Sequence, residues 1–238
     1  MTDKHILHML SPLKHMSPFD ANMALDAGYD AVVPYTQVTL SEVQGLVQDA
    51  MFSRPPKIGV KTGVFIGGKQ AIEALDMLAA GKKSLVPPFG ISFFADPAGS
   101  FTTAAAMVAC VEKLLRVKKK RELKGLRVAV FGATGVVGFS SAVIAALEGA
   151  DVTLVGHDGV KRVSESASEI KARFGVDTHA ADGSDDSKKA AILANAEVAL
   201  CAGRAGVQIL SAKQLDAAKG LLIVARSPRV FAHRTPAS

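Results

Sequence analysis

Short runs of hydrophobic residues alternate with segments of helical pattern along the whole chain. The runs are rich in Val, Ile and Phe, which favour strands. Alternation of this kind is typical of a parallel sheet covered by helices, so we predict an α/β fold. Nine strands are expected, over residues 5–10, 30–34, 62–67, 90–95, 127–131, 151–156, 176–180, 197–201 and 221–225.

Several helix ends carry chemical signals. Ser17 followed by Pro18 suits a first helical turn, and Thr39 with Glu42 three residues later forms a capping box. Gly81 and Gly175 are expected to end their helices, because glycine readily adopts the left-handed conformation that often follows a helix.

A charged segment, VKKKRELKGLR at residues 117–127, separates two halves of the chain. It follows a long helix expected over 100–118 and has no apolar periodicity. We therefore predict an N-terminal α/β domain over residues 1–118 and a Rossmann-type parallel sheet over residues 119–225. Its residues Lys118 to Arg121 fit a solvated helix end, which the helix dipole favours, better than a binding patch.

A glycine-rich turn, VFGATGVVG at residues 130–138, lies between strand 127–131 and a helix expected over 136–149. Gly132, Gly135 and Gly138 allow the backbone to bend and to approach a diphosphate, which then meets free N–H groups at the helix N-terminus. We therefore predict dinucleotide binding, with a merely structural turn as the alternative. The spacing Gly-x-x-Gly-x-x-Gly differs from the usual Gly-x-Gly-x-x-Gly. The exact shape of the turn is therefore less well predicted, whereas the predicted ligand is the same.

The residues after strand 151–156 bear on the choice between NAD and NADP. An acidic residue there binds the ribose hydroxyls of NAD and repels the additional phosphate of NADP. His157 does not repel a phosphate, and Lys161 or Arg162 could pair with one for about 1.5–3 kcal/mol. Asp158 acts in the opposite direction, so we expect NADP to bind without strong exclusion of NAD. Alternatively, Lys161 and Arg162 are simply exposed on a first helical turn.

The first half presents small and polar side chains at the carboxyl ends of its strands, where open α/β sheets bind ligands. The segment ADPAGSFTTAAA at residues 95–106 is the most suggestive, because its loop leads directly into the helix that joins the halves. Its hydroxyl residues could equally well only cap that helix. The available side chains are Lys14, Asp20, Thr36, Gln37, Lys69, Asp96, Ser100, Thr102 and Thr103.

Composition narrows the class of partner. The net charge is +6, but the positive residues are scattered, whereas nucleic-acid-binding proteins concentrate them on one face, so a phosphate-bearing small molecule is the expected anion. Cys110 and Cys201 lie far apart in apolar stretches, and no segment approaches the roughly 20 apolar residues of a membrane span. We expect no nucleic-acid partner, no membrane, no targeting signal and a cytoplasmic location.

Catalytic and metal-binding motifs are missing from the sequence. Gly-x-Ser-x-Gly and His-Glu-x-x-His do not occur, and His5, His8 and His15 are irregularly spaced, so we expect no metal. This absence suits an enzyme whose nicotinamide carries the chemistry, because hydride transfer mainly requires donor and acceptor carbons aligned about 3–3.5 Å apart.

Five segments share a more specific character: HMLSPLKHMSPFDANMALDAGYD, VPYTQVTL, FIGGK, FADPAGSFTTAAAMVA and VFGATGVVGFSSAVIAALEGADVTLVGHDG. Together they resemble the bacterial NAD(P)-dependent methylenetetrahydromethanopterin dehydrogenases of methylotrophs, over residues 5 to about 225. The resemblance implies two α/β domains around a cleft. It also implies oxidation of the methylene group of methylenetetrahydromethanopterin to methenyl, with hydride passing to NADP or NAD, within formaldehyde oxidation.

The resemblance also implies roles for particular residues. Residues 1–118 would bind the reduced pterin, and residues 119–225 the dinucleotide. The catalytic residues would be Lys14, Asp20 and Asp96, and the substrate-binding residues Gly99, Ser100 and Thr102. The coenzyme would be held by Gly132, Thr134, Gly135, Val136, Val137 and Gly138 at its diphosphate, and by His157 and Arg162 at the adenosine ribose or its phosphate.

The chain departs from the family after strand 221–225. Family members continue with a polar, proline-containing loop and a closing helix, whereas residues 226–238 are rich in Arg, Pro, Ser and Ala without apolar periodicity. We expect a disordered tail and a truncated or frame-shifted end.

Two other functions stay open at this point. If the altered end leaves the cleft incomplete, the chain could be a non-catalytic NAD(P)-binding protein. Methylenetetrahydrofolate dehydrogenase is the second alternative, because the two carriers share a similar reactive centre. We further expect a homo-oligomer, in which the alanine-rich segments 102–109 and 141–146 either form subunit contacts or are buried within the fold.

Overall fold

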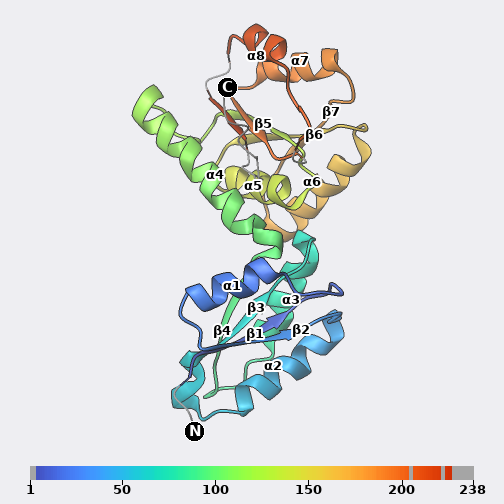
Figure 1. Ribbon diagram of the computed structural model, residues 1–238. Coiled ribbons are helices and arrows are strands. Elements are labelled where there is room, and N and C mark those ends of the chain that lie inside the picture. The colour runs from blue at the N-terminus through green and yellow to red at the C-terminus, as the bar shows by residue number, and fades with distance from the viewer. Residues whose placement is uncertain (1–3, 204–205, 221–222, 227–238) are drawn as a thin grey trace, which may run out of the picture. The chain divides into compact units, whose positions relative to one another are not determined.

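The computed structural model describes residues 4–203, 206–220 and 223–226, and the chain divides into two compact units, Met1–Phe101 and Thr102–Ser238 (Figure 1). Each unit contains one parallel sheet with helices, which confirms the predicted α/β fold. The expected tail lies outside the described residues except for Arg226, which ends the last strand. Division of function between residues 1–118 and 119–225 stays a prediction.

The first unit is built on a four-stranded parallel sheet in the order β2-β1-β3-β4. Its elements are β1 (Ile6–Leu10), α1 (Pro18–Asp26), β2 (Ala31–Tyr35), α2 (Val43–Phe52), β3 (Thr62–Ile66), α3 (Ala71–Lys83) and β4 (Ser92–Ala95), with short 3₁₀ turns at Leu40–Glu42, Pro56–Lys61 and Pro97–Gly99. Leu10 is in register with Tyr35 and Ile66, and Ile66 with Ala95. All four strands therefore end at one edge of the sheet.

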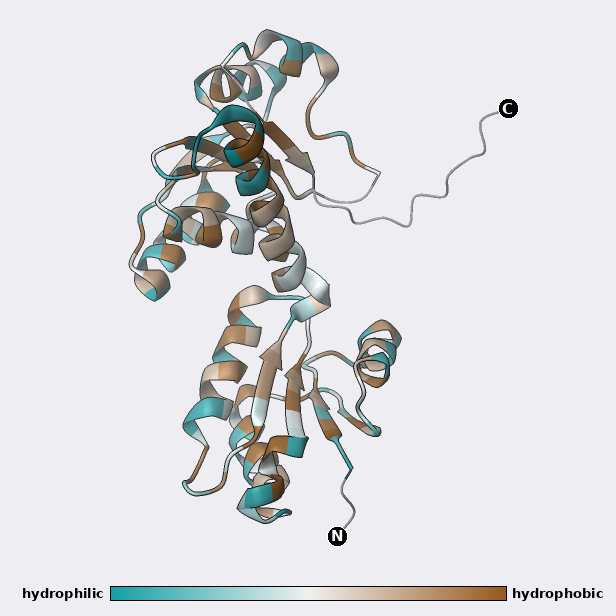
Figure 2. Ribbon diagram, turned by 90° about the vertical axis from the view of Figure 1, so that its left-hand side faces the viewer, coloured by the Kyte–Doolittle hydropathy of each residue, from teal (hydrophilic) through white to brown (hydrophobic). Residues whose placement is uncertain are grey.

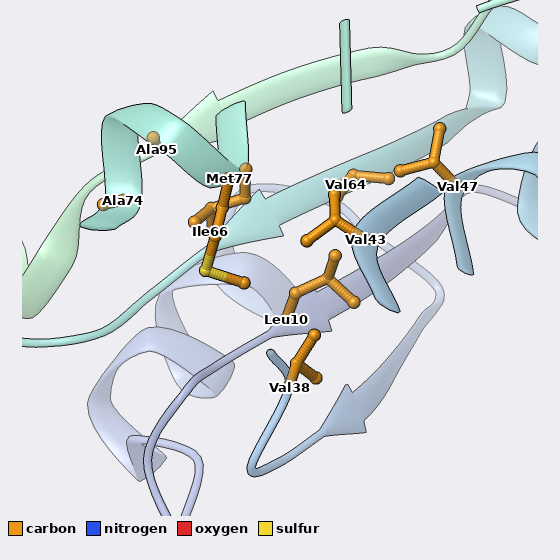
Figure 3. Close-up of a cluster of buried hydrophobic side chains, with 9 residues drawn as sticks. All are labelled: Leu10, Val38, Val43, Val47, Val64, Ile66, Ala74, Met77 and Ala95. Carbon is orange, nitrogen blue, oxygen red and sulfur yellow. The ribbon is translucent and has the colours of Figure 1, made fainter. Parts of the chain in front are cut away.

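Helices cover both faces of this sheet. Successive side chains of a strand point to opposite faces, so apolar residues on both faces need a covering helix. On one face, side chains from the strands, α2 and α3 form a buried cluster (Figure 3). On the other face Leu7, Met9 and Phe65 pack with Ala24 of α1. Burial of a large aliphatic side chain contributes about 1.5–3 kcal/mol, so these two clusters hold the strand ends in place. The first cluster comprises Leu10, Val38, Val43, Val47, Val64, Ile66, Ala74, Met77 and Ala95.

The second unit contains a five-stranded parallel sheet in the order β7-β6-β5-β8-β9. The order reverses direction between β5 and β8, where the two halves of a Rossmann fold meet. Its elements are α4 (Ser100–Leu114, whose first two residues belong to the first unit), a π-helical turn (Leu115–Lys119), β5 (Arg127–Phe131), α5 (Val136–Leu147), β6 (Asp151–Gly156), α6 (Lys161–Phe174), β7 (His179–Asp182), α7 (Asp186–Asn195), β8 (Val198–Cys201), α8 (Ala212–Ala217) and β9 (Ile223–Arg226).

Most residues of β5 and α5 in the second unit are buried. Residues 128–131 of β5 are at most 2% exposed, and within 141–146 of α5 only Ile144 is partly exposed. The alanine-rich segment 141–146 is therefore buried within the fold. Figure 2 shows the strands of both sheets mainly in brown, the hydrophobic end of its scale. Parallel strands that are covered on both faces require this composition.

Most sequence signals for helix ends are confirmed. The Ser17 Oγ accepts a hydrogen bond at 3.3 Å from the N–H of Asp20 at the start of α1. Thr39 and Glu42 form the predicted capping box, and Gly175, with a φ of +71°, ends α6.

The prediction that Gly81 ends its helix is wrong. Gly81 lies inside α3, which continues to Lys83. A Cβ on Gly81 would lie 2.7 Å from Cε1 of Phe93, so the glycine allows close packing of α3 against β4. Close packing of a helix backbone against a neighbouring ring, like chain reversal, selects glycine.

The helical segment Pro97–Lys119 is, by length and composition alone, able to cross a membrane, although the sequence pattern predicts no span there. Its buried side chains follow helical spacing: Ala104, Val108, Val111 and Leu115 are each at most 2% exposed. Packing of this face within the fold accounts for part of the apolar composition, and 33% of the most apolar 18-residue stretch is buried. Residues 118–121 are exposed, as expected for a solvated helix end.

Candidate active site

The glycine turn after β5 is shaped by close backbone contacts. Gly132 has a φ of +78°, and a Cβ there would lie 2.8 Å from the carbonyl carbon and oxygen of Ala202, which follows β8. A Cβ on Gly138 would lie only 2.2 Å from the carbonyl oxygen of Gly132. Both positions therefore require glycine, and the turn lies at the point where the strand order reverses.

The N-terminus of α5 opens directly from this turn. Gly135 is its N-cap residue, and among the described residues no side chain caps the helix. The first N–H groups of a helix lack partners within the helix and carry the positive end of its dipole, so they bind anions. Gly135 is exposed, and Thr134 and Val136 are half-buried. The turn therefore fits the diphosphate of a dinucleotide, with amides from Val136 to Gly138 as donors.

A second tight turn follows β6. A Cβ on Gly156 would lie 1.9 Å from the carbonyl oxygen of Gly159, so the chain folds back immediately after the strand. His157 lies in this turn with 72% of its side chain exposed. The predicted residue at the ribose position is therefore accessible.

Arg162 connects the two turns. Its Nη1 donates to Oδ2 of Asp158 at 3.2 Å, and its Nη2 donates to Oγ1 of Thr134 at 3.3 Å. The hydrogen bond from Arg162 is the main cause that lowers the pKa of Asp158, and the nearby His157 adds to it. The structure thus brings Thr134, His157 and Arg162 together, as a coenzyme site requires.

In the first unit, the loops at the carboxyl edge of the sheet are joined by backbone hydrogen bonds. The N–H of Gln37 donates to the carbonyl of Leu13 at 2.9 Å. The N–H of Val38 donates to the carbonyl of Ser11 at 3.0 Å. The N–H of Asp96 donates to the carbonyl of Ile66 at 3.1 Å. The loops after β1 and β2 are therefore joined to each other, and so are the ends of β3 and β4.

Two predicted carboxylates lie near each other at this edge. Asp96 is 6% exposed, and its Oδ1 accepts a hydrogen bond of 2.7 Å from the N–H of Phe101. Burial raises the pKa of Asp20; the Ser17 hydroxyl opposes this shift, and the negative charge of Asp96 adds to it. Lys14 is exposed on the loop after β1, at the same edge.

The loop between β4 and α4 has an uncommon backbone. Ala98 has a φ of +54° and Gly99 one of +62°. A left-handed conformation at a residue with a Cβ costs free energy and is often found at functional sites. Ser100 is fully buried, with its Oγ 3.4 Å from the carbonyl oxygen of Ala98, whereas Thr102 is exposed.

Two features of the site have no role among the residues assigned from the sequence. From the sequence, Lys69 is named only as an available polar side chain. In the structure it is exposed after the Gly67–Gly68 turn that follows β3. The strand order of the first sheet reverses between β1 and β3, so Lys69 lies beside that point. The pair of glycines at the end of a strand is the sequence feature that could have indicated a site at Lys69. The hydrogen bond between Arg162 and Thr134 could not be predicted from a local sequence motif, because 28 residues separate the two positions.

An open pocket of about 500 Å³ lies beside the end of β2 in the first unit. None of the predicted site residues, all of which lie in the described ranges, lines it. Its lining residues are Tyr35, Thr36, Val38, Ser41, Glu42, Gly45, Leu46 and Asp49.

A Rossmann sheet with an uncapped helix above a glycine turn, joined to a second parallel α/β unit, defines a dinucleotide-binding protein of two units. The chain is 55% identical over 220 residues to an NAD(P)-dependent methylenetetrahydromethanopterin dehydrogenase from Methylorubrum extorquens, covering 92% of this chain and 74% of the relative. It therefore belongs to the methylenetetrahydromethanopterin dehydrogenase family. A sequence profile described as "Methylene-tetrahydromethanopterin dehydrogenase, N-terminal" matches residues 18–98.

More distant similarities are found as well. The chain is 32% identical over 194 residues to bifunctional protein MdtA from Methylorubrum extorquens, covering 82% of this chain and 66% of that protein. Aspartate transcarbamoylase from Trypanosoma cruzi aligns at 14% identity with a TM-score of 0.48, over 92% of this chain and 70% of that one. L-tryptophan dehydrogenase from Nostoc punctiforme aligns at 13% identity with a TM-score of 0.40, over 94% and 62%.

Proposed function

We propose that this chain oxidises methylenetetrahydromethanopterin to its methenyl form, with NAD+ or NADP+ as the hydride acceptor. The observation that carries the proposal is 55% identity over 92% of the chain to a dehydrogenase named for this reaction. The glycine turn supports it independently, because Gly132 and Gly138 are required for close backbone approach at an uncapped helix.

The second unit is proposed to bind the coenzyme. Amides of Val136, Val137 and Gly138, the first residues of α5, would hold the diphosphate. Gly132 and Gly135 would shape the turn, in which the N–H of Gly135 donates to the carbonyl of Gly132 at 3.0 Å. His157 and Arg162 would face the adenosine ribose or its phosphate, because they follow β6. Thr134, whose Oγ1 accepts a hydrogen bond from Arg162, would lie at the diphosphate.

The first unit is proposed to bind the pterin through Lys14, Asp20 and Asp96, with Gly99, Ser100 and Thr102 beside them. The cation that remains on the pterin is shared by its own two nitrogens, so the chain does not have to move a proton in that step. Asp20 and Asp96 would favour this developing positive charge, since preorganised charges of opposite sign stabilise a transition state. The other residues would position the substrate.

The test of the function is direct. Purified protein is mixed with methylenetetrahydromethanopterin and NADP+ or NAD+, and reduced nicotinamide is followed by its near-ultraviolet absorbance. We expect pterin-dependent formation of the reduced coenzyme. Coenzyme binding without turnover would support the non-catalytic alternative. A higher kcat/KM with methylenetetrahydrofolate would support the folate alternative, which the family membership does not favour.

The role of Lys14 is tested by Lys14→Ala. If its ammonium binds the pterin, losing a charge-assisted hydrogen bond should raise the KM for the pterin by roughly tenfold or more, with the KM for NADP+ unchanged. Lys57→Ala is the matched control, because Lys57 is exposed in the turn before β3, at the opposite edge of the sheet. Unchanged turnover of Lys14→Ala at low pterin concentration would remove Lys14 from the site.

A cytoplasmic location and a homo-oligomeric state are proposed for the same protein. Cys110 and Cys201 are both thiols, which suits a reducing compartment. The partly exposed alanine-rich segment 102–109 of α4 is the candidate subunit contact, and light scattering of the purified chain would test it.

A further inference from the structure

The two hydrogen bonds of Arg162 place one guanidinium between the turn after β5 and the turn after β6. It reaches Asp158 at 3.2 Å and Thr134 at 3.3 Å. In a Rossmann sheet these two turns border the adenosine ribose of a bound dinucleotide. Arg162 and Asp158 thus lie where a 2′-hydroxyl or a 2′-phosphate has to be accommodated.

The ion pair between them is exposed and exchangeable. The side chains of Arg162 and Asp158 are 53% and 46% exposed, and exposed ion pairs are weak. A phosphate, by contrast, binds a guanidinium through two parallel hydrogen bonds. The carboxylate of Asp158 also lies 3.8 Å from Nδ1 of His157, so one acidic group contacts both Arg162 and His157.

We propose that Asp158 and Arg162 form an exchangeable pair that sets the coenzyme preference. With NADP, the guanidinium turns from Asp158 to the 2′-phosphate, and the carboxylate opposes that phosphate. With NAD, the pair stays closed and Asp158 accepts from a ribose hydroxyl. Thr134 keeps Arg162 within reach in both states. This inference rests on the proposed function and identifies how the same coenzyme site discriminates between its two ligands.

Asp158→Asn tests the inference without relying on turnover. Binding of adenosine 2′,5′-bisphosphate and of 5′-AMP is measured by calorimetry, since only the first carries the 2′-phosphate. We expect Asp158→Asn to tighten bisphosphate binding about threefold to tenfold, because a like charge is removed. It should weaken 5′-AMP binding by roughly twofold to fivefold, because the ribose hydroxyl then donates to a neutral acceptor. Arg162→Gln should weaken bisphosphate binding about tenfold or more. The NADP/NAD ratio of kcat/KM should shift in the same directions.

Glu169→Gln is the matched control, because Glu169 and Arg173 form an ion pair of the same spacing further along α6. It should change neither affinity. Equal selectivity of wild type, Asp158→Asn and Arg162→Gln would overturn the inference and leave the dehydrogenase function standing if reduced coenzyme still forms. Folded protein that binds neither adenosine fragment would reject the dinucleotide site itself.

Discussion

Gly138→Ala is expected to abolish coenzyme binding and to destabilise the second unit. The new methyl group would lie 2.2 Å from the carbonyl oxygen of Gly132 and 2.9 Å from Cα of Ala133, both backbone atoms that side-chain rotation cannot move. Overpacking of this kind costs about 1–3 kcal/mol. The turn must shift to relieve it, and a misplacement of about 1 Å costs roughly 100-fold in activity. Urea denaturation and titration with NADPH measure the two effects.

Two other glycines provide controls for this variant. Gly45 lies inside α2, and a Cβ there would meet no atom of the described residues within 4 Å. Gly45→Ala should therefore keep coenzyme affinity and gain up to about 1 kcal/mol of stability from helix propensity. At Gly135 a Cβ would meet the carbonyl oxygen of Gly132 at an ordinary 3.4 Å. Gly135→Ala should fold normally yet bind NADPH less tightly. Full NADPH affinity in both turn variants would rule out this turn as the diphosphate site.

The fold could be predicted from the sequence because each strand is a short apolar run with turn residues on both sides. The pattern failed where tertiary packing decided the outcome. Gly81 carries the local signal of a helix end, yet what requires a glycine there is the ring of Phe93, which lies on a different element. The strand expected at 176–180 is found at His179–Asp182, because its pairing with β6 begins at Thr153.

The candidate site was predictable to the extent that it follows strand ends. Gly132 and Asp96 both come directly after apolar runs, and the parallel topology brings such positions to one edge of each sheet. What the sequence could not supply is the state of each side chain. Burial of Asp96 and the double hydrogen bond of Arg162 depend on residues that are brought together only by folding.

Asp96→Asn is expected to reduce kcat/KM for the pterin while leaving the fold intact. The asparagine Oδ1 can still accept the hydrogen bond from the N–H of Phe101, which is 2.7 Å long in the native protein, so the start of α4 keeps its cap. The negative charge is lost. A hydrogen bond to a charged group is worth about 1.5–3 kcal/mol, so kcat/KM should fall roughly 10- to 150-fold. Initial rates at saturating NADP+ measure the loss of kcat/KM, and a thermal melt shows whether the fold is intact.

Asp96→Ala and Asp185→Asn complete the experiment. Alanine at position 96 removes the cap as well as the charge, so it should lose the same activity and about 1 kcal/mol of stability in addition. Asp185 is the N-cap residue of α7, with its Oδ1 2.9 Å from the N–H of Lys188, and it lies in the other unit. Asp185→Asn should therefore leave kcat/KM for the pterin unchanged. If Asp96→Asn also keeps full activity, the carboxylate serves only to begin α4, and the charge that favours the pterin cation has to come from Asp20 alone.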